Sequence, residues 1–174
     1  MFGLEWNLPS NTLSVTPHLP ADWQYATVRN IPFGTARVDL KFMRSGSDLV
    51  VEAIHAPAGV RLASHTAGTH AEAATLHIPL PDVEAAVAIP VPEFGAESNQ
   101  LKVIDQKIAA HSFALTLAGI GGETYKLQLR ENAPNLHVHA DGAMLGASSQ
   151  GLRSAEVAFP PGAGYTDKTV VFSW

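Results

Sequence analysis

Hydrophobic and polar residues alternate with a period of two along much of the chain, which predicts β-strands with one buried face. The stretch Ala36–Phe42 shows the pattern clearly, with apolar residues at its even-numbered positions and charged residues at its odd-numbered positions. The small residues Ser45-Gly46-Ser47 separate it from Asp48–His55, which is rich in Val and Ile. These two stretches are therefore predicted to form an antiparallel β-hairpin.

A second pair of alternating stretches, Phe113–Leu117 and Tyr125–Leu129, lies in the other half of the chain. Gly119 and Gly121-Gly122 stand between them and favour a turn. The pattern predicts a second hairpin.

Shorter stretches complete a set of about ten predicted strands, separated by turns rich in Gly and Pro. They are Thr12–Thr16, Ala26–Ile31, Ala74–Ile78, Leu101–Ile104, Leu136–Ala140, Ala155–Phe159 and Thr169–Trp174. Only Asp82–Ala86 suits one turn of helix, because Pro81 and Asp82 favour a helix start. The pattern indicates an all-β fold, an antiparallel β-sandwich of about ten short strands.

The chain of 174 residues has no linker-like or low-complexity segment, so one domain spanning residues 1–174 is expected. Two proline-containing segments, Ile78–Pro81 and Ile89–Pro92, are expected at sheet edges or at crossovers between sheets. Proline lacks the N–H that a central strand must donate.

The composition excludes several classes of function. Charged residues make up 16% of the chain and the net charge is −5, which argues against a nucleic-acid partner. The absence of cysteine excludes disulfides, thiolate catalysis and iron–sulfur clusters. No apolar run approaches the roughly 18 residues that a membrane-spanning helix needs, so no membrane partner is expected. The sequence indicates no compartment.

Histidines form the first candidate site. His137 and His139 flank Val138, so on a strand both imidazoles would project from one face and could chelate a metal. A cupin-like site would also need Glu four or five residues further on, where the chain has Ala143 and Met144. We therefore expect the pair to fill polar positions of a strand, with no metal and no other cofactor.

The remaining histidines and the acidic residues carry no specific catalytic pattern. His65 and His70 lie in a predicted loop rich in Ser, Thr and Gly, and their spacing fits neither a strand nor a helical zinc motif. The acids are expected on polar strand faces and in turns. No catalytic residue is assigned.

Aromatic residues form the second candidate site. Trp6, Trp23 and Tyr25 are candidates for carbohydrate binding, because flat aromatic rings stack on the apolar faces of sugars. Trp174 is expected instead to cover the core at the end of the chain.

The run Leu13–Trp23 has the form L-x-V-x-P-x-L-P-x-x-W, and Ala26–Gly34 and the hairpin around Gly46 follow it. This order resembles the C-terminal β-sandwich that follows the (α/α)6 barrel in bacterial six-hairpin glycoside hydrolases, either α-L-rhamnosidase-like or glycogen-debranching-like. The resemblance extends from Leu13 to about Ala53.

The resemblance implies a non-catalytic accessory domain that packs on the catalytic barrel of a larger glycoside hydrolase and stabilises it. Catalytic carboxylates in that family belong to the barrel, so the resemblance assigns none here, and no hydrolysis by the chain alone is expected. A parent enzyme of this kind is compatible with a periplasmic or extracellular location.

Two alternatives stay open. The chain could be an autonomous carbohydrate-binding module that uses Trp23, Tyr25 and Trp6, or a small metal-dependent β-barrel enzyme built on the face of His137 and His139. The apolar segment Met1–Leu8 is expected either to fold back across a sheet edge or to mediate self-association.

Overall fold

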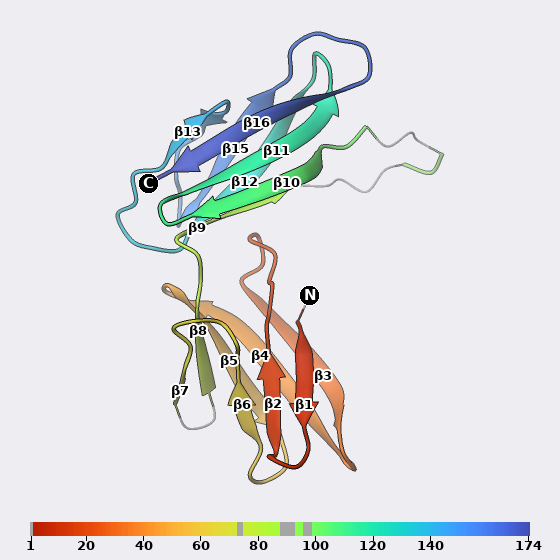
Figure 1. Ribbon diagram of the computed structural model, residues 1–174, viewed down its shortest axis with the longest axis vertical. Helices are drawn as coiled ribbons and strands as arrows, with labels where there is room; N and C mark the ends of the chain where they lie inside the picture. The colour runs from red at the N-terminus through yellow and green to blue at the C-terminus, as the bar shows by residue number, and fades with distance from the viewer. Residues whose placement is uncertain (1, 73–74, 88–92, 96–98) are drawn as a thin grey trace. The chain divides into compact units, whose positions relative to one another are not determined.

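The computed structural model describes residues 2–72, 75–87, 93–95 and 99–174 (Figure 1). These residues form sixteen strands, and no helix occurs among them. Every pair of neighbouring strands is antiparallel except β2 and β6, which are parallel. The predicted all-β, antiparallel sandwich class is confirmed. Within the described part of the chain, no helix is long and apolar enough to cross a membrane.

The chain divides into two compact units, Met1–Asp82 and Val83–Trp174, and each has its own hydrophobic core. This differs from the single domain predicted over residues 1–174. Each unit contains eight strands that pair only with strands of the same unit. The boundary falls between Asp82 and Val83 without a Gly- or Ser-rich linker, so composition does not reveal it.

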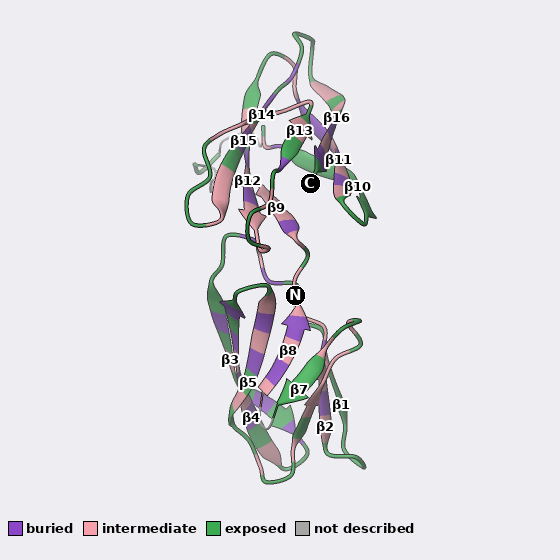
Figure 2. Cartoon of the chain, turned by 90° about the vertical axis from the view of Figure 1, so that its left-hand side faces the viewer, coloured by how far each residue is buried: buried purple, intermediate pink, exposed green. Residues whose placement is uncertain are grey.

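The first unit is a sandwich of two sheets, with strand orders β1-β2-β6 and β3-β4-β5-β8-β7. Its strands are β1 (Leu4–Asn7), β2 (Thr12–Val15), β3 (Tyr25–Phe33), β4 (Ala36–Ser45), β5 (Asp48–His55), β6 (Arg61–Ala63), β7 (His70–Glu72) and β8 (Thr75–Pro79). Figure 2 shows buried and more exposed residues alternating along β5 and β8, as the period-two pattern requires.

The core of the first unit lies between its two sheets. Leu13 and Val15 of the smaller sheet share it with Leu40 and Phe42 of the larger one, and all four are fully buried. The Phe2 ring packs on Phe42 with centroids 4.8 Å apart. Strand β1 pairs with β2, so the N-terminal segment folds back on a sheet edge, as one of the two predicted outcomes.

The hairpin predicted around Gly46 is confirmed. Ser45 of β4 pairs with Asp48 of β5, which leaves a two-residue turn. Gly46 has φ of 60°, a conformation that side-chain-bearing residues adopt at a cost.

The second unit is also a sandwich of two sheets, with strand orders β10-β11-β16-β13 and β14-β15-β12-β9. Its strands are β9 (Val83–Val87), β10 (Lys102–Ala109), β11 (Ser112–Ile120), β12 (Thr124–Glu131), β13 (His139–Asp141), β14 (Met144–Leu145), β15 (Leu152–Ala158) and β16 (Tyr165–Ser173). Trp174 packs against its core with its ring 6.2 Å from Phe113, the covering position that the sequence predicts.

The second predicted hairpin is wrong. Strand β11 pairs with β10 and β16, whereas β12 pairs with β15 and β9, so the glycine-rich turn carries the chain from one sheet to the other. A Cβ on Gly119 would lie 2.6 Å from the Phe159 ring, and one on Gly121 would lie 2.5 Å from the Gly162 carbonyl oxygen. These glycines permit close packing where the chain changes sheets.

Other local predictions also differ from the structure. Asp82–Ala86 forms no helical turn, because Val83–Val87 is strand β9 and pairs with β12. In the stretch Leu136–Ala140 only the last two residues belong to a strand. Ile78–Pro81 does lead the chain out of its sheet, while Ile89–Pro92 lies outside the described residues.

Candidate functional site

A cavity in the first unit lies beside Trp6, one of the predicted site residues. Its volume is about 600 Å³. The residues that line it come from the turn between β1 and β2, from both of these strands and from the segment after β6: Glu5, Trp6, Asn7, Leu8, Pro9, Ser14 and His65.

Local pairing holds this cavity in place. Glu5 and Ser14 are direct cross-strand partners in β1 and β2. In the turn that joins these strands, the Ser10 N–H donates to the Asn7 side-chain oxygen over 3.3 Å, and Asn11 has a positive φ of 50°. Hydrogen bonds within the turn thus help to position Asn7.

The cavity combines one aromatic surface with several polar groups. The Trp6 side chain is 50% exposed, so an indole face is open to a ligand. Glu5 offers carboxylate acceptors, and Asn7, Ser14 and His65 offer both donors and acceptors. Such a surface suits a ligand with an apolar face and many hydroxyl groups.

The other two predicted sugar-binding residues lie elsewhere in the first unit. Tyr25, 67% exposed, begins β3 in the five-stranded sheet, and Trp23, 42% exposed, stands two residues before it. Trp6 belongs to the three-stranded sheet. The three aromatic candidates are therefore all exposed, but Trp23 and Tyr25 are not among the residues that line the cavity beside Trp6.

Tyr25 ends a row of cross-strand neighbours that crosses the whole five-stranded sheet. The register pairs Tyr25 with Met43, Met43 with Val50, Val50 with His77, and His77 with His70. Direct partners project from the same face of a sheet. This outer face therefore carries aromatic, thioether and imidazole groups in one line.

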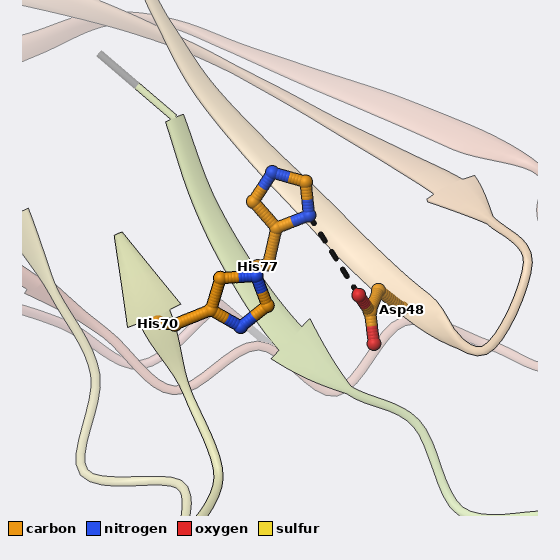
Figure 3. A group of neighbouring side chains, drawn as sticks. All are labelled: Asp48, His70 and His77. Atoms are coloured by element: carbon orange, nitrogen blue, oxygen red, sulfur yellow. Dashed lines mark ion pairs between the residues drawn. The ribbon is translucent and has the colours of Figure 1, made fainter. Parts of the chain in front are cut away.

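At the far end of this row, one group of side chains in the described part of the chain could hold a metal ion: Asp48, His70 and His77 (Figure 3). Their nearest ligand atoms all lie within 4.8 Å of one another. The imidazole rings of His70 and His77 stack, with centroids 4.8 Å apart and planes inclined by 13°. Sequence reasoning placed His70 in a loop and missed this group.

The sequence feature that corresponds to this cluster is the placing of His70 and His77 at equal distances from the point between residues 73 and 74. Strands β7 and β8 pair His70 with His77 and Glu72 with Thr75, so residues equidistant from that point face each other. No Gly, Pro, Asn or Asp stands between Glu72 and Thr75 in the sequence, and the pairing of β7 with β8 was not predicted.

The histidine pair singled out from the sequence does not form a metal-binding group within the described residues. His139 lies in β13, but His137 precedes the strand, with its Nδ1 atom 3.2 Å from the Asn135 carbonyl oxygen. Both side chains are exposed. The strand needed to aim them in one direction is too short to include both.

Comparisons of the chain with protein-family models, with curated proteins and with solved structures found no match.

Proposed function

We propose that this chain is a non-catalytic carbohydrate-binding module of a carbohydrate-active enzyme, and that it binds sugar in the cavity beside Trp6. The observation that supports this function best is the union of an exposed indole and polar side chains in one cavity of about 600 Å³. Binding sites for small molecules usually have volumes of roughly 300–1,000 Å³.

The chemistry of the cavity matches that of a sugar ring. The apolar C–H face of the ring would stack on the Trp6 indole at the edge strand β1. Its hydroxyl groups would reach around this edge to exchange hydrogen bonds with Glu5, Asn7 and Ser14, which project from the other face of the strand pair. Polar groups already positioned by strand pairing lose little freedom on binding, which favours affinity.

The same residues argue against cleavage of the sugar at this site. Glycoside hydrolysis uses two carboxyl groups about 5 to 10 Å apart. Glu5 is the one carboxylate among the residues that line the cavity. The proposed role is therefore binding without hydrolysis.

Titration of the full chain with a panel of neutral and acidic oligosaccharides tests the proposal, with tryptophan fluorescence and calorimetry as readouts. We expect at least one oligosaccharide to bind, and Trp6→Ala to lose at least tenfold in affinity. Trp23→Ala is a matched control, because it removes a similarly exposed tryptophan outside the cavity. A panel without any ligand, or binding that Trp6→Ala leaves unchanged, would contradict the proposal.

A second candidate function is the packing of the chain on a catalytic (α/α)6 barrel, as the family resemblance implies. The observation that favours it is strand β10, an edge strand whose residues are all exposed and which carries Val103, Ile104 and Ile108. Exposed apolar edge strands promote association. In the absence of a barrel, we expect the chain to self-associate at high concentration and the Ile108→Lys variant to sediment as a monomer. A strictly monomeric chain would count against this role.

A further inference from the structure

We propose that Asp48, His70 and His77 form a binding site for a divalent transition-metal ion of the zinc class, on the outer face of the five-stranded sheet. The three residues come from the adjacent strands β5, β7 and β8. This site is separate from the residues that line the cavity of the proposed sugar-binding function.

Strand pairing places the three side chains on one face. His70 and His77 are direct partners, and Asp48 pairs with Pro79, two residues beyond His77. Residues two apart on a strand share a face, so all three project together. Leu49, Leu76 and Ile78 alternate with them and are buried in the core on the opposite face, which anchors the backbone beneath the site.

The distances are close to those that a metal ion requires. The Nδ1 atom of His77 lies 3.7 Å from the Oδ2 atom of Asp48, as the dashed line in Figure 3 shows. Tetrahedral zinc with bonds of about 2.0 to 2.2 Å holds its ligand atoms about 3.3 to 3.6 Å apart. The ligand atoms here lie within 4.8 Å of one another, so small side-chain rotations close the site. His70 is exposed, so its ring has room for such a rotation.

The loop before β7 fixes the position of His70. The Thr69 hydroxyl donates to the Thr66 carbonyl oxygen over 2.7 Å. Gly68 sits against Pro79, the partner of Asp48, so closely that a Cβ would lie 3.1 Å from the proline ring. The loop that leads into His70 thus packs beside the strand pair that carries the carboxylate.

The donor set decides the class of ion. Two imidazoles and one carboxylate suit Zn²⁺ and its neighbours in the transition series, whereas Ca²⁺ and Mg²⁺ prefer oxygen ligands. Three protein ligands leave a fourth tetrahedral position open to water or an added ligand. A bound ion would join the three-residue strand β7 to β5 across β8. Binding to the folded state alone raises thermal stability.

Calorimetric titration of the chelator-treated full chain with zinc chloride tests the site. We expect one ion per chain, a concentration-dependent rise in the unfolding temperature, and no comparable rise with calcium chloride. The affinity for zinc should fall at least tenfold in His70→Ala and in His77→Ala, and Asp48→Asn should weaken it as well. Binding should also weaken in acid, because imidazole ligates only when neutral.

His137→Ala and His139→Ala serve as controls, because each removes an exposed histidine outside the cluster. Both should bind zinc as the unaltered chain does. Since His70 is exposed, His70→Ala tests the site even if His77→Ala weakens folding. Shifts of the His70 and His77 imidazole NMR resonances on adding zinc to the unaltered chain provide a second readout. Absence of stoichiometric binding, binding unchanged in His70→Ala, or binding lost in either control variant would overturn the proposal.

Failure of this site and failure of the proposed sugar-binding function are separable. Zinc binding is read from the His70 and His77 variants, and sugar binding from the Trp6 variant. The two measurements share no substituted residue.

Discussion

Arg44 donates a hydrogen bond from its side-chain Nε to the carbonyl oxygen of Trp23, over 2.9 Å. Arg44 is only 6% exposed, and its guanidinium also reaches the carbonyl oxygens of Leu19 and Pro20, at 3.3 and 3.4 Å. One side chain of β4 therefore fixes the proline-rich segment that leads to Trp23. The guanidinium group of arginine presents several N–H donors in one plane, so it can bond several carbonyl oxygens better than the ammonium group of lysine can.

Replacing Arg44 should destabilise the first unit. Arg44→Met removes the donors and leaves backbone carbonyls without these partners, so we expect a loss of about 2–4 kcal/mol in the free energy of unfolding. Arg44→Lys should also be destabilising, because lysine keeps the positive charge but lacks the planar set of guanidinium N–H donors. Chemical denaturation measures the unfolding free energy of both variants, and Arg29→Met, which replaces an exposed arginine, is the control. Equal stability of Arg44→Met and the control would contradict this account.

Asp39 should make the first unit sensitive to acid. The backbone N–H of Asn30 and, second, the His55 side chain hydrogen-bond its carboxylate, at 2.7 and 2.9 Å, and hold the pKa of Asp39 below its ordinary value. A carboxyl group with a lowered pKa in the folded state stabilises the fold above its unfolded pKa, and this contribution is lost as pH falls.

The direction in which the stabilisation by Asp39 changes with pH gives a direct test. The difference in unfolding free energy between the unaltered chain and Asp39→Asn should shrink as pH falls from about 5 to about 2. His55→Ala keeps the Asn30 bond, the larger cause of the shift, and should retain most of the pH dependence. Denaturant titrations across this pH range measure both. A difference that stays constant with pH would refute the prediction.

Gly121 should tolerate no side chain, because its neighbour is backbone and cannot rotate away. A Cβ there would lie 2.5 Å from the Gly162 carbonyl oxygen, so we expect Gly121→Ala to cost about 2–4 kcal/mol. Gly164→Ala is a useful comparison, since Gly164 has φ of 73° but open space around it. Its cost should be only about 1–2 kcal/mol. Thermal unfolding ranks the two variants, and the reverse order would show that the turn adjusts.

The two hydrophobic cores should respond separately to cavities. Leu40 and Leu129 are both fully buried, the first in the core of the first unit and the second in that of the second. Leu40→Ala and Leu129→Ala should each cost about 2–5 kcal/mol. Hydrogen exchange should show the loss of protection concentrated in the strands of the altered unit. Equal loss throughout both units in each variant would contradict the assignment of two cores.

The alternation of apolar and polar residues was enough to predict the all-β fold and the faces of individual strands. In Ala36–Phe42 it identifies Val38, Leu40 and Phe42, all fully buried, because a strand turns successive side chains to opposite faces. The hairpin around Gly46 could also be predicted, since its two strands are joined by a short turn. The exposure of Trp6 and Trp23 could not, because aromatic residues serve equally well as core and as surface.

Only the tertiary structure decided which strands pair and where the cores divide. A period of two marks the buried face of Phe113–Leu117 and of Tyr125–Leu129 but does not choose their partners, and each belongs to a different sheet. Likewise, the approach of Asp48 to His77 depends on pairing between residues that lie more than twenty positions apart in the sequence. The physical reason is that burial pattern is a local property of the chain, whereas pairing is selected by packing between segments far apart in sequence.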